Sequence, residues 1–348
     1  MDMTTKLNTS RPALFLALGA FLLSVPSLCA QDRARLSTIP RVDVHAHLAG
    51  DMQLMEGYLK IGKILKDKHD VNMDIWIDLG SGKKLEKLAV GKFNEVQEKY
   101  NGRFLQCISD YRIRDGLRYT PEEIAEWQAH GAVGYKIWVG VSALSDAGSN
   151  EPTYAKMEEL GFLGASIHVS QPYPTKWCKS IIGFWEAQNA WERVMDRHPK
   201  MKLVMAHMFN YNMSDEQLDY LQYVMETYPN VNLDLAARIG WVFHTDREKL
   251  RDFTIKYADR ILFGTDIGDQ PSRERAEITA RRYHRCFEIL ETDKIVGAGF
   301  YPGPGAGTKE VKGMALPTDV LEKIYYKNAI RLYPRVKEVL QQMGYALD

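Results

Sequence analysis

The chain has 348 residues, of which 45% are apolar and 11% aromatic, so it is long enough to bury a substantial hydrophobic core. Lysine plus arginine and aspartate plus glutamate both number 45, which gives a formal net charge of zero at pH 7. This balance provides no basic field for nucleic acid or acidic lipid, and it favours a small molecule as the partner.

The first segment has the features of a secretory signal peptide. Two basic residues precede an apolar stretch over residues 12–25, and a proline and small residues follow it, with cleavage expected near Cys29 or Ala30. The apolar stretch is shorter than the roughly 20 residues that a membrane-spanning helix needs. We therefore predict a signal peptide over residues 1–30, a single mature domain over residues 31–348, and a periplasmic or secreted protein without a membrane anchor.

Beyond the first 40 residues the chain repeats one unit, a short apolar run rich in β-branched and aromatic residues followed by a segment of helical periodicity. Eight such runs predict strands over residues 42–47, 73–79, 104–109, 133–139, 163–169, 203–208, 232–237 and 261–267. Eight strand–helix units predict an α/β fold, a single TIM-like (β/α)8 barrel with its functional groups at the C-terminal ends of the strands. An open doubly wound sheet is the alternative, but no G-x-G-x-x-G motif follows an early strand.

Two of the intervening segments have clear helix start and stop residues. Thr120, followed by a proline and acidic residues, and Gly131 at the other end predict a helix over residues 120–131. Ser214 and apolar residues at three-to-four spacing predict another helix over residues 214–229.

Two histidines end the first predicted strand, in the stretch DVHAH. Because alternate residues of a strand face the same side, His45 and His47 are expected to project together into the barrel. His168, His207 and Asp266 lie at or near the ends of the fifth, sixth and eighth predicted strands. For any single histidine a hydrogen-bonded place in the core is the alternative. Together, neutral nitrogen donors and one carboxylate at a common mouth predict a site for a divalent metal ion such as Zn²⁺.

Several segments, in this order, resemble the amidohydrolase superfamily: DVHAH, SIHV, VMAHM, NLDLAA and ILFGTDIG. The segment over residues 316–334 is similar to the closing segment of the amidohydrolase-2 branch, and the resemblance covers residues 40–335. These motifs are specific for the superfamily and not for a substrate. Its members include hydrolases of amides and lactones and metal-dependent decarboxylases of aromatic and related acids.

The resemblance implies that His45, His47, His168 and Asp266 hold a single divalent metal ion, with zinc expected. It also implies that His207 hydrogen-bonds the metal-bound water or the substrate. Asp266 would accept the proton of that water, whose pKa the metal lowers to about 7. The resulting prediction is a hydrolase of a small lactone, ester or amide. The signal peptide favours it over a decarboxylase of an aromatic or related acid, and a non-catalytic ligand-binding barrel is the least favoured hypothesis.

Lys136, in the fourth predicted strand, has two interpretations. In binuclear members of the superfamily a carboxylated lysine bridges two metals there, with His168 and His207 holding the second. The amidohydrolase-2 branch instead favours one metal and an ammonium group that binds an anionic part of the substrate. Trp138 and Arg238 are further candidates for substrate contacts, Arg238 because a guanidinium matches planar carboxylate geometry. A homodimer is compatible with the sequence, and the oligomeric state stays open.

Overall fold

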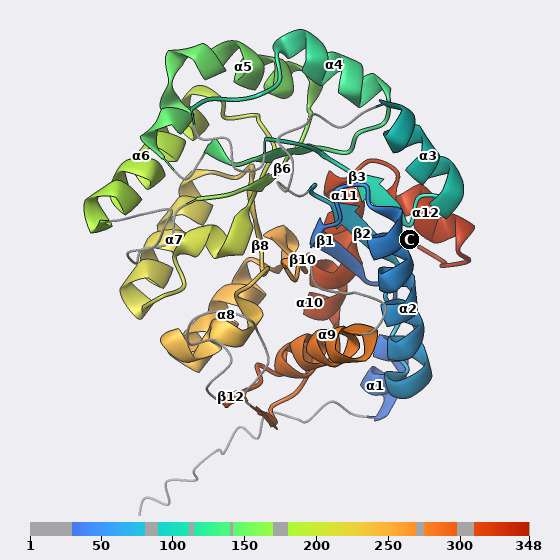
Figure 1. Ribbon diagram of the computed structural model, residues 1–348. Coiled ribbons are helices and arrows are strands. Elements are labelled where there is room, and N and C mark those ends of the chain that lie inside the picture. Colours follow the sequence, from blue (N-terminus) through green and yellow to red (C-terminus); the bar gives the residue numbers. More distant parts are fainter. Residues whose placement is uncertain are drawn as a thin grey trace, which may run out of the picture.

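The first strand of the barrel, β1 (Val42–His47), lies in parallel beside the last one, β10 (Ile267–Gly268), in the computed structural model. The strands between them are β2 (Ile75–Asp78), β3 (Phe104–Gln106), β4 (Ile108–Ser109), β5 (Tyr135–Ile137), β6 (Gly164–Ile167), β7 (Leu203–Met205), β8 (Val231–Asp234) and β9 (Ile261–Leu262). β3 and β4 together form one strand position, because β3 pairs with β2 and β4 pairs with β5. In the same way β9 and β10 form one strand position, since β9 pairs with β8 and β10 pairs with β1. The parallel ladder therefore closes into a barrel of eight strand positions, which helices surround (Figure 1).

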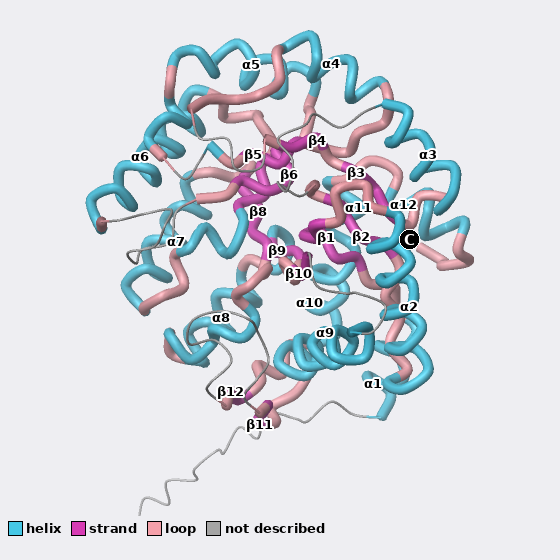
Figure 2. The backbone as a smooth tube through the Cα atoms, viewed as in Figure 1, coloured by secondary structure: helices cyan, strands magenta, loops and turns pink. Residues whose placement is uncertain are grey.

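The structure describes residues 30–80, 90–110, 115–139, 142–169, 180–268, 275–297 and 310–347. Their α-helices are α1 (Ala30–Thr38), α2 (Met52–His69), α3 (Val90–Tyr100), α4 (Pro121–Ala129), α5 (Glu151–Leu160), α6 (Ile181–Arg197), α7 (Asp215–Thr227), α8 (Arg247–Lys256), α9 (Ala276–Glu291), α10 (Thr318–Glu322), α11 (Asn328–Leu332) and α12 (Val336–Gln342). β11 (Ile295–Val296) and β12 (Val311–Lys312) form a short antiparallel pair away from the barrel. Figure 2 shows the barrel strands at the centre and the longer helices around them.

The predicted (β/α)8 barrel is confirmed, although most of its strands are shorter than predicted. The largest differences lie at the C-terminal ends of two strands. The strand predicted over residues 203–208 ends early with β7, and the one predicted over residues 261–267 is interrupted between β9 and β10. In both places the backbone adopts a positive φ, 60° at His207 and 59° at Asp266, which an extended strand does not allow.

Both predicted helices are confirmed. Thr120 precedes α4 and accepts the N–H of Glu123, whose side chain accepts the N–H of Thr120 in return. Ser214 caps α7 by accepting the N–H of Gln217. Gly131 follows α4 with a φ of 95°, a backbone conformation that glycine adopts easily. The caps satisfy N–H groups that the first turn of a helix leaves without a partner.

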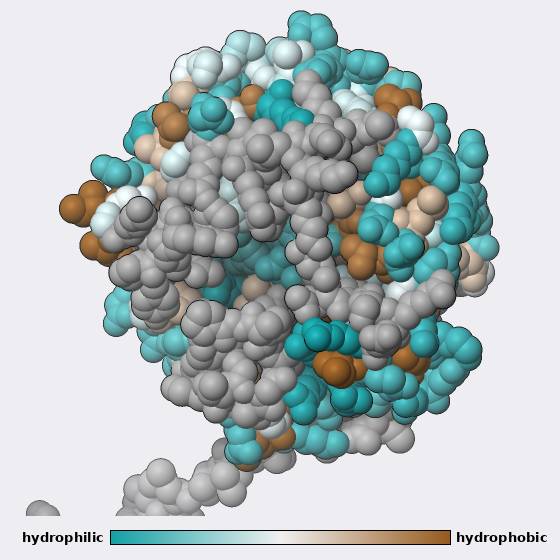
Figure 3. Space-filling model, viewed as in Figure 1, coloured by the Kyte–Doolittle hydropathy of each residue, from teal (hydrophilic) through white to brown (hydrophobic). Residues whose placement is uncertain are grey.

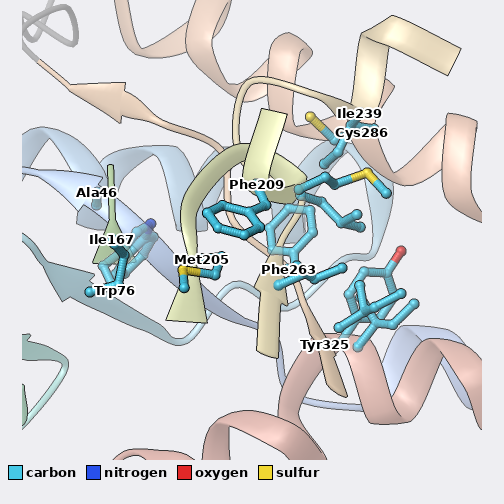
Figure 4. Close-up of a cluster of buried hydrophobic side chains, with 14 of the residues drawn as sticks. Ala46, Trp76, Ile167, Met205, Phe209, Ile239, Phe263, Cys286 and Tyr325 are labelled. Carbon is cyan, nitrogen blue, oxygen red and sulfur yellow. The ribbon is translucent and has the colours of Figure 1, made fainter. Parts of the chain in front are cut away.

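Two hydrophobic clusters hold the strands and helices together. The larger one lies between the strands and the surrounding helices and includes Trp76, Phe263 and Tyr325 (Figure 4). The smaller one joins apolar strand residues to α11 and α12, and in it Tyr333 donates its hydroxyl to the carbonyl of Ala165 at 3.1 Å. The C-terminal helices therefore cover the N-terminal ends of the strands, and the C-terminal ends form the mouth.

The predicted signal peptide lies outside the described residues except for Ala30, where α1 begins, and the boundary before residue 31 stays a prediction. Within the described ranges, no helix has both the length and the apolar character that crossing a bilayer requires. Exposed apolar side chains lie on α6, where Ile181 and Ile182 are 54% and 67% exposed, and Figure 3 shows hydrophobic surface over this helix.

Candidate metal centre

A bulge in β1 turns His45 and His47 toward the inside of the barrel. The register of β1 against β2 shifts between Asp43 and Ala46, so that β1 has one extra residue there. Before the bulge, Asp43 faces outward and accepts the hydroxyl of Tyr283 in α9 at 2.5 Å. After it, the imidazole of His45 lies near side chains of β6 and β8, across the barrel. The prediction that the two histidines face the same way is confirmed.

Three donor atoms converge at the mouth, from the first strand and the last. Oδ1 of Asp266 lies 3.4 Å from Nε2 of His45 and 3.2 Å from Nε2 of His47, and one ligand atom of each residue lies within 4.8 Å of the others. Nε2 of His45 is buried and has no hydrogen-bond partner among the described residues. A buried nitrogen lone pair beside a second imidazole and a carboxylate is the environment that a divalent metal satisfies, so these residues fit such an ion.

Hydrogen bonds on the other side of each ring fix the tautomers of the two histidines. Nδ1 of His45 lies 2.8 Å from Oδ2 of Asp234, and Nδ1 of His47 lies 2.5 Å from the carbonyl oxygen of Gly80. Because a carboxylate and a carbonyl only accept, both Nδ1 atoms carry a proton, and in the neutral form of each ring Nε2 keeps the lone pair. The two rings are therefore prepared to ligate through Nε2.

Asp234 is a further candidate functional residue, which the sequence patterns did not single out. It is fully buried at the end of β8 and also accepts the backbone N–H groups of His207 at 2.8 Å and Ala236 at 3.1 Å. Burial by itself raises the pKa of Asp234, but the charge and hydrogen bond of His45 outweigh it and lower the pKa. A carboxylate that ends a predicted buried strand, within the NLDLAA motif, is the sequence feature that could have revealed it.

His168 and His207 lie beside this donor set as a second pair of imidazoles. Nε2 of His207 is 3.2 Å from Nδ1 of His168, and the ring centroids of His207 and His45 are 5.0 Å apart. Nδ1 of His207 lies 2.9 Å from the carbonyl oxygen of Ala236, which places its proton on Nδ1 and a lone pair on Nε2. His207 can therefore accept a hydrogen bond or ligate a metal, but its neutral ring cannot donate from Nε2 to a substrate carbonyl.

Burial keeps these two imidazoles neutral. It lowers the pKa of His207 to about 3, and burial followed by the charge of His207 lowers the pKa of His168 well below its usual value. Burial would raise the pKa of Asp266, but the adjacent imidazoles of His45 and His47 hold it well below its usual value. Neutral imidazoles and an ionised carboxylate are the protonation states that metal ligands need.

His207 begins a strained turn of four consecutive left-handed residues, which replaces the end of the predicted strand. The φ angles of His207, Met208, Phe209 and Asn210 are 60°, 52°, 57° and 58°. Each left-handed residue other than glycine costs roughly 1–2 kcal/mol. Hydrogen bonds offset this cost, since Gln188 donates to the carbonyl of Phe209 at 3.1 Å. Strain of this kind is typical of a backbone that must direct a functional side chain.

Lys136 lies inside the barrel next to the donor set. It is fully buried, and its Nζ donates to Oγ of Ser166 at 2.8 Å, while Oγ of Ser166 is 3.5 Å from Nδ1 of His45. Within the described part of the chain no carboxylate forms an ion pair with Lys136. Burial lowers the pKa of Lys136 to about 8, against the opposing charge of Asp266. With this pKa the buried side chain can exist as an ammonium or as a neutral amine near neutral pH. It therefore suits either of the predicted interpretations.

The other two predicted substrate contacts hold different positions. Trp138 stacks on His168, with ring centroids 3.9 Å apart, and is thus a wall of the site. Arg238 is buried and donates to Oδ1 of Asn210, whose Nδ2 in turn donates to the carbonyl of Val169 at 2.9 Å. Arg238 therefore belongs to a hydrogen-bonded group that joins the ends of three neighbouring strands.

Comparisons with known proteins found one matching family and several similar structures. The sequence model of a family described as amidohydrolase matches residues 90–335. A 5-carboxyvanillate decarboxylase from Novosphingobium aromaticivorans, solved with manganese and 4-hydroxy-3-methoxy-5-nitrobenzoic acid, is 12% identical, with a TM-score of 0.50 over 85% of this chain and 96% of that one. An uncharacterized TIM-barrel protein from Bordetella bronchiseptica is 15% identical over 88% of this chain and 100% of that one, with a TM-score of 0.47. No curated protein sequence matches this chain.

Proposed function

Because this chain belongs to the amidohydrolase family, we propose that it is a metal-dependent hydrolase of a small carbonyl substrate, a lactone, ester or amide. The observation that carries the proposal is the convergence of Nε2 of His45, Nε2 of His47 and Oδ1 of Asp266 at the mouth of the barrel. A divalent ion bound there supplies Lewis-acid chemistry and lowers the pKa of a coordinated water to about 7. Zinc suits a site rich in imidazole nitrogen, and His168 is the further ligand that we propose.

The protein's own residues would handle the proton. Asp266 is 29% exposed at its side chain, so it can be reached from the mouth, and its contacts with the two histidines use Oδ1. We propose that Oδ2 of Asp266 accepts the proton of the attacking water and then delivers it to the leaving group. Nε2 of His207 has a single lone pair and lies 3.2 Å from Nδ1 of His168, so we propose that it accepts the N–H of His168 and orients that ring instead of the water.

A decarboxylase is the second candidate, and the cations near the site favour it. The buried ammonium of Lys136 and the guanidinium of Arg238 lie near the histidine cluster, where they complement a carboxylate. The fold neighbour from Novosphingobium aromaticivorans carries the name of a decarboxylase. The hydrolase stays the first candidate because a predicted secreted location suits extracellular carbonyl substrates better than the breakdown of aromatic acids.

The test is a substrate screen with the purified, metal-analysed protein. Lactones, esters and amides are assayed for hydrolysis, and aromatic acids for release of CO₂. Hydrolysis that Asp266→Asn abolishes, while Asp293→Asn at an exposed position after α9 has no effect, would support the proposal. Release of CO₂ without any hydrolysis would select the decarboxylase instead.

A further inference from the structure

The indole of Trp138 lies flat against the imidazole of His168. The two ring centroids are 3.9 Å apart and the planes meet at 18°, and Trp138 is only 4% exposed. Such a contact opposes rotation of the imidazole out of its plane, while the contact between Nδ1 of His168 and Nε2 of His207 opposes rotation within the plane. The direction of the remaining nitrogen, Nε2 of His168, is thereby determined by Trp138 and His207 together.

Trp138 in turn is held by Asp110, a fully buried carboxyl group that the proposed reaction does not use. Oδ1 of Asp110 accepts the backbone N–H of Trp138 at 2.5 Å, and Oδ2 accepts the hydroxyl of Tyr135 at 3.3 Å. The backbone N–H of Asp110 donates to the carbonyl of Lys136 at 3.2 Å. These three bonds fasten the end of β5 to the end of β4 at the residue whose indole covers His168.

We propose that Trp138 and Asp110 are positioning residues that aim the imidazole of His168 at the metal, Trp138 by stacking and Asp110 by holding the backbone of Trp138. This inference rests on the proposed metal-dependent function. It gives Trp138 a role different from the substrate contact that the sequence suggested. Groups of this kind around a metal ligand typically change metal affinity by 10- to 100-fold when they are removed.

The experiment uses Co²⁺ alone as the probe, because its visible absorption spectrum reports the geometry of its ligands. The Kd for Co²⁺ and this spectrum are measured for the full-length protein and for Trp138→Leu, which fills much of the space without a planar ring. Trp138→Phe keeps a stacking ring. Trp191→Leu is the matched control, since Trp191 is fully buried in α6 and packs on Tyr154 away from the mouth.

We expect Trp138→Leu to bind Co²⁺ 10- to 100-fold more weakly with an altered spectrum, and Trp138→Phe and Trp191→Leu to resemble the wild type. Asp110→Ala should weaken binding in the same way. Asp110→Asn should restore it, because its amide oxygen can still accept the N–H of Trp138.

Three results would overturn the inference. Trp138→Leu could bind Co²⁺ as the wild type does, Trp191→Leu could lose as much affinity, or Asp110→Asn could be as weak as Asp110→Ala. Failure of the proposed metal centre has a different pattern, since the wild type itself would then bind no Co²⁺, whereas release of CO₂ instead of hydrolysis would leave Co²⁺ binding by the wild type intact.

Discussion

Nδ1 of His45 lies 2.8 Å from Oδ2 of Asp234, and neither side chain is exposed to solvent. The pair joins the first barrel strand to β8 on the side of the ring that faces away from the donor set. A carboxylate in this position holds the ligand ring and increases the basicity of its other nitrogen. We therefore expect Asp234 to support metal binding by holding His45.

Asp234→Ala should weaken Zn²⁺ binding by about 10- to 100-fold, because His45 loses the acceptor that fixes its tautomer. Asp234→Asn should have a smaller effect, since its amide oxygen can accept the same proton. Competition with a chromophoric chelator measures the affinity, and Asp293→Asn serves as the control at an exposed site. An unchanged affinity in Asp234→Ala would show that Asp234 only supports the backbone.

His47→Ala should reduce the metal content of the purified protein to far below one equivalent, and the activity with it. The substitution removes one nitrogen from a site with few donors to spare. Mass spectrometry of the metals in the wild type, in His47→Ala and in His130→Ala, an exposed histidine at the end of α4, provides the comparison. Full metal content in His47→Ala would remove the basis of the proposed centre.

Lys136 distinguishes one metal from two. We expect Lys136→Met to keep one equivalent of metal and to bind anionic substrates more weakly, with no effect of bicarbonate, because its Nζ already has Ser166 as a partner. Metal analysis and assays with and without bicarbonate test this. Two equivalents in the wild type, with loss of one in Lys136→Met, would instead indicate a carboxylated lysine and make His207 a ligand.

The metal-free protein should lose stability in mild acid. The pKa of His207 is lowered to about 3, against 6.5 for an unperturbed histidine, and that of His168 is also lowered, so the unfolded chain binds more protons below pH 6.5. The free energy of unfolding should then fall by about 1.4 kcal/mol per pH unit for each such histidine as the pH decreases. His45 acts in the opposite sense, because its raised pKa adds stability that is present below 6.5 and lost as the pH rises through the raised value.

Urea unfolding of the metal-free protein between about pH 7 and pH 5 measures this slope. His207→Gln should reduce the pH dependence of the free energy of unfolding by the contribution of one histidine, while His130→Gln should leave this pH dependence unchanged. The same slope in His207→Gln and in the wild type would contradict the prediction.

Export is the fifth prediction. In the native host the mature protein should begin between Ala30 and Arg33 and should be soluble after cell lysis, because residues 12–25 have the pattern of a cleavable apolar segment. N-terminal sequencing of the fractionated protein tests this. An intact N-terminus in the membrane pellet would contradict it.

The sequence was sufficient to predict the barrel and the residues that meet at its mouth. Strand periodicity is local, and the rule that parallel strands end at one mouth brings His45, His47 and Asp266 together once the eight strands are recognised, whereas His168 lies beside this set in contact with His207. The family resemblance is confirmed by the match over residues 90–335. It supports the same assignment, because the motifs occur along the chain in the order that the family has.

What the sequence could not predict depends on contacts between distant segments. The bulge in β1 is visible only in the register against β2, and the left-handed turn at His207 replaces a run of residues that resembles a strand. Asp110 and Asp234 are each a single acid next to an apolar run, and only their partners on neighbouring strands give them a role. Local propensity carries no information about such partners.

The pairing of β1 with β10 has a consequence for how the protein matures. His45 and His47 belong to the first strand of the barrel and Asp266 lies directly before the last one, so no nascent chain that stops before Asp266 contains the complete donor set. A shorter nascent chain holds at most the imidazoles. We therefore expect high-affinity binding of a metal ion only after Asp266 has been synthesised and the two ends of the parallel ladder have met.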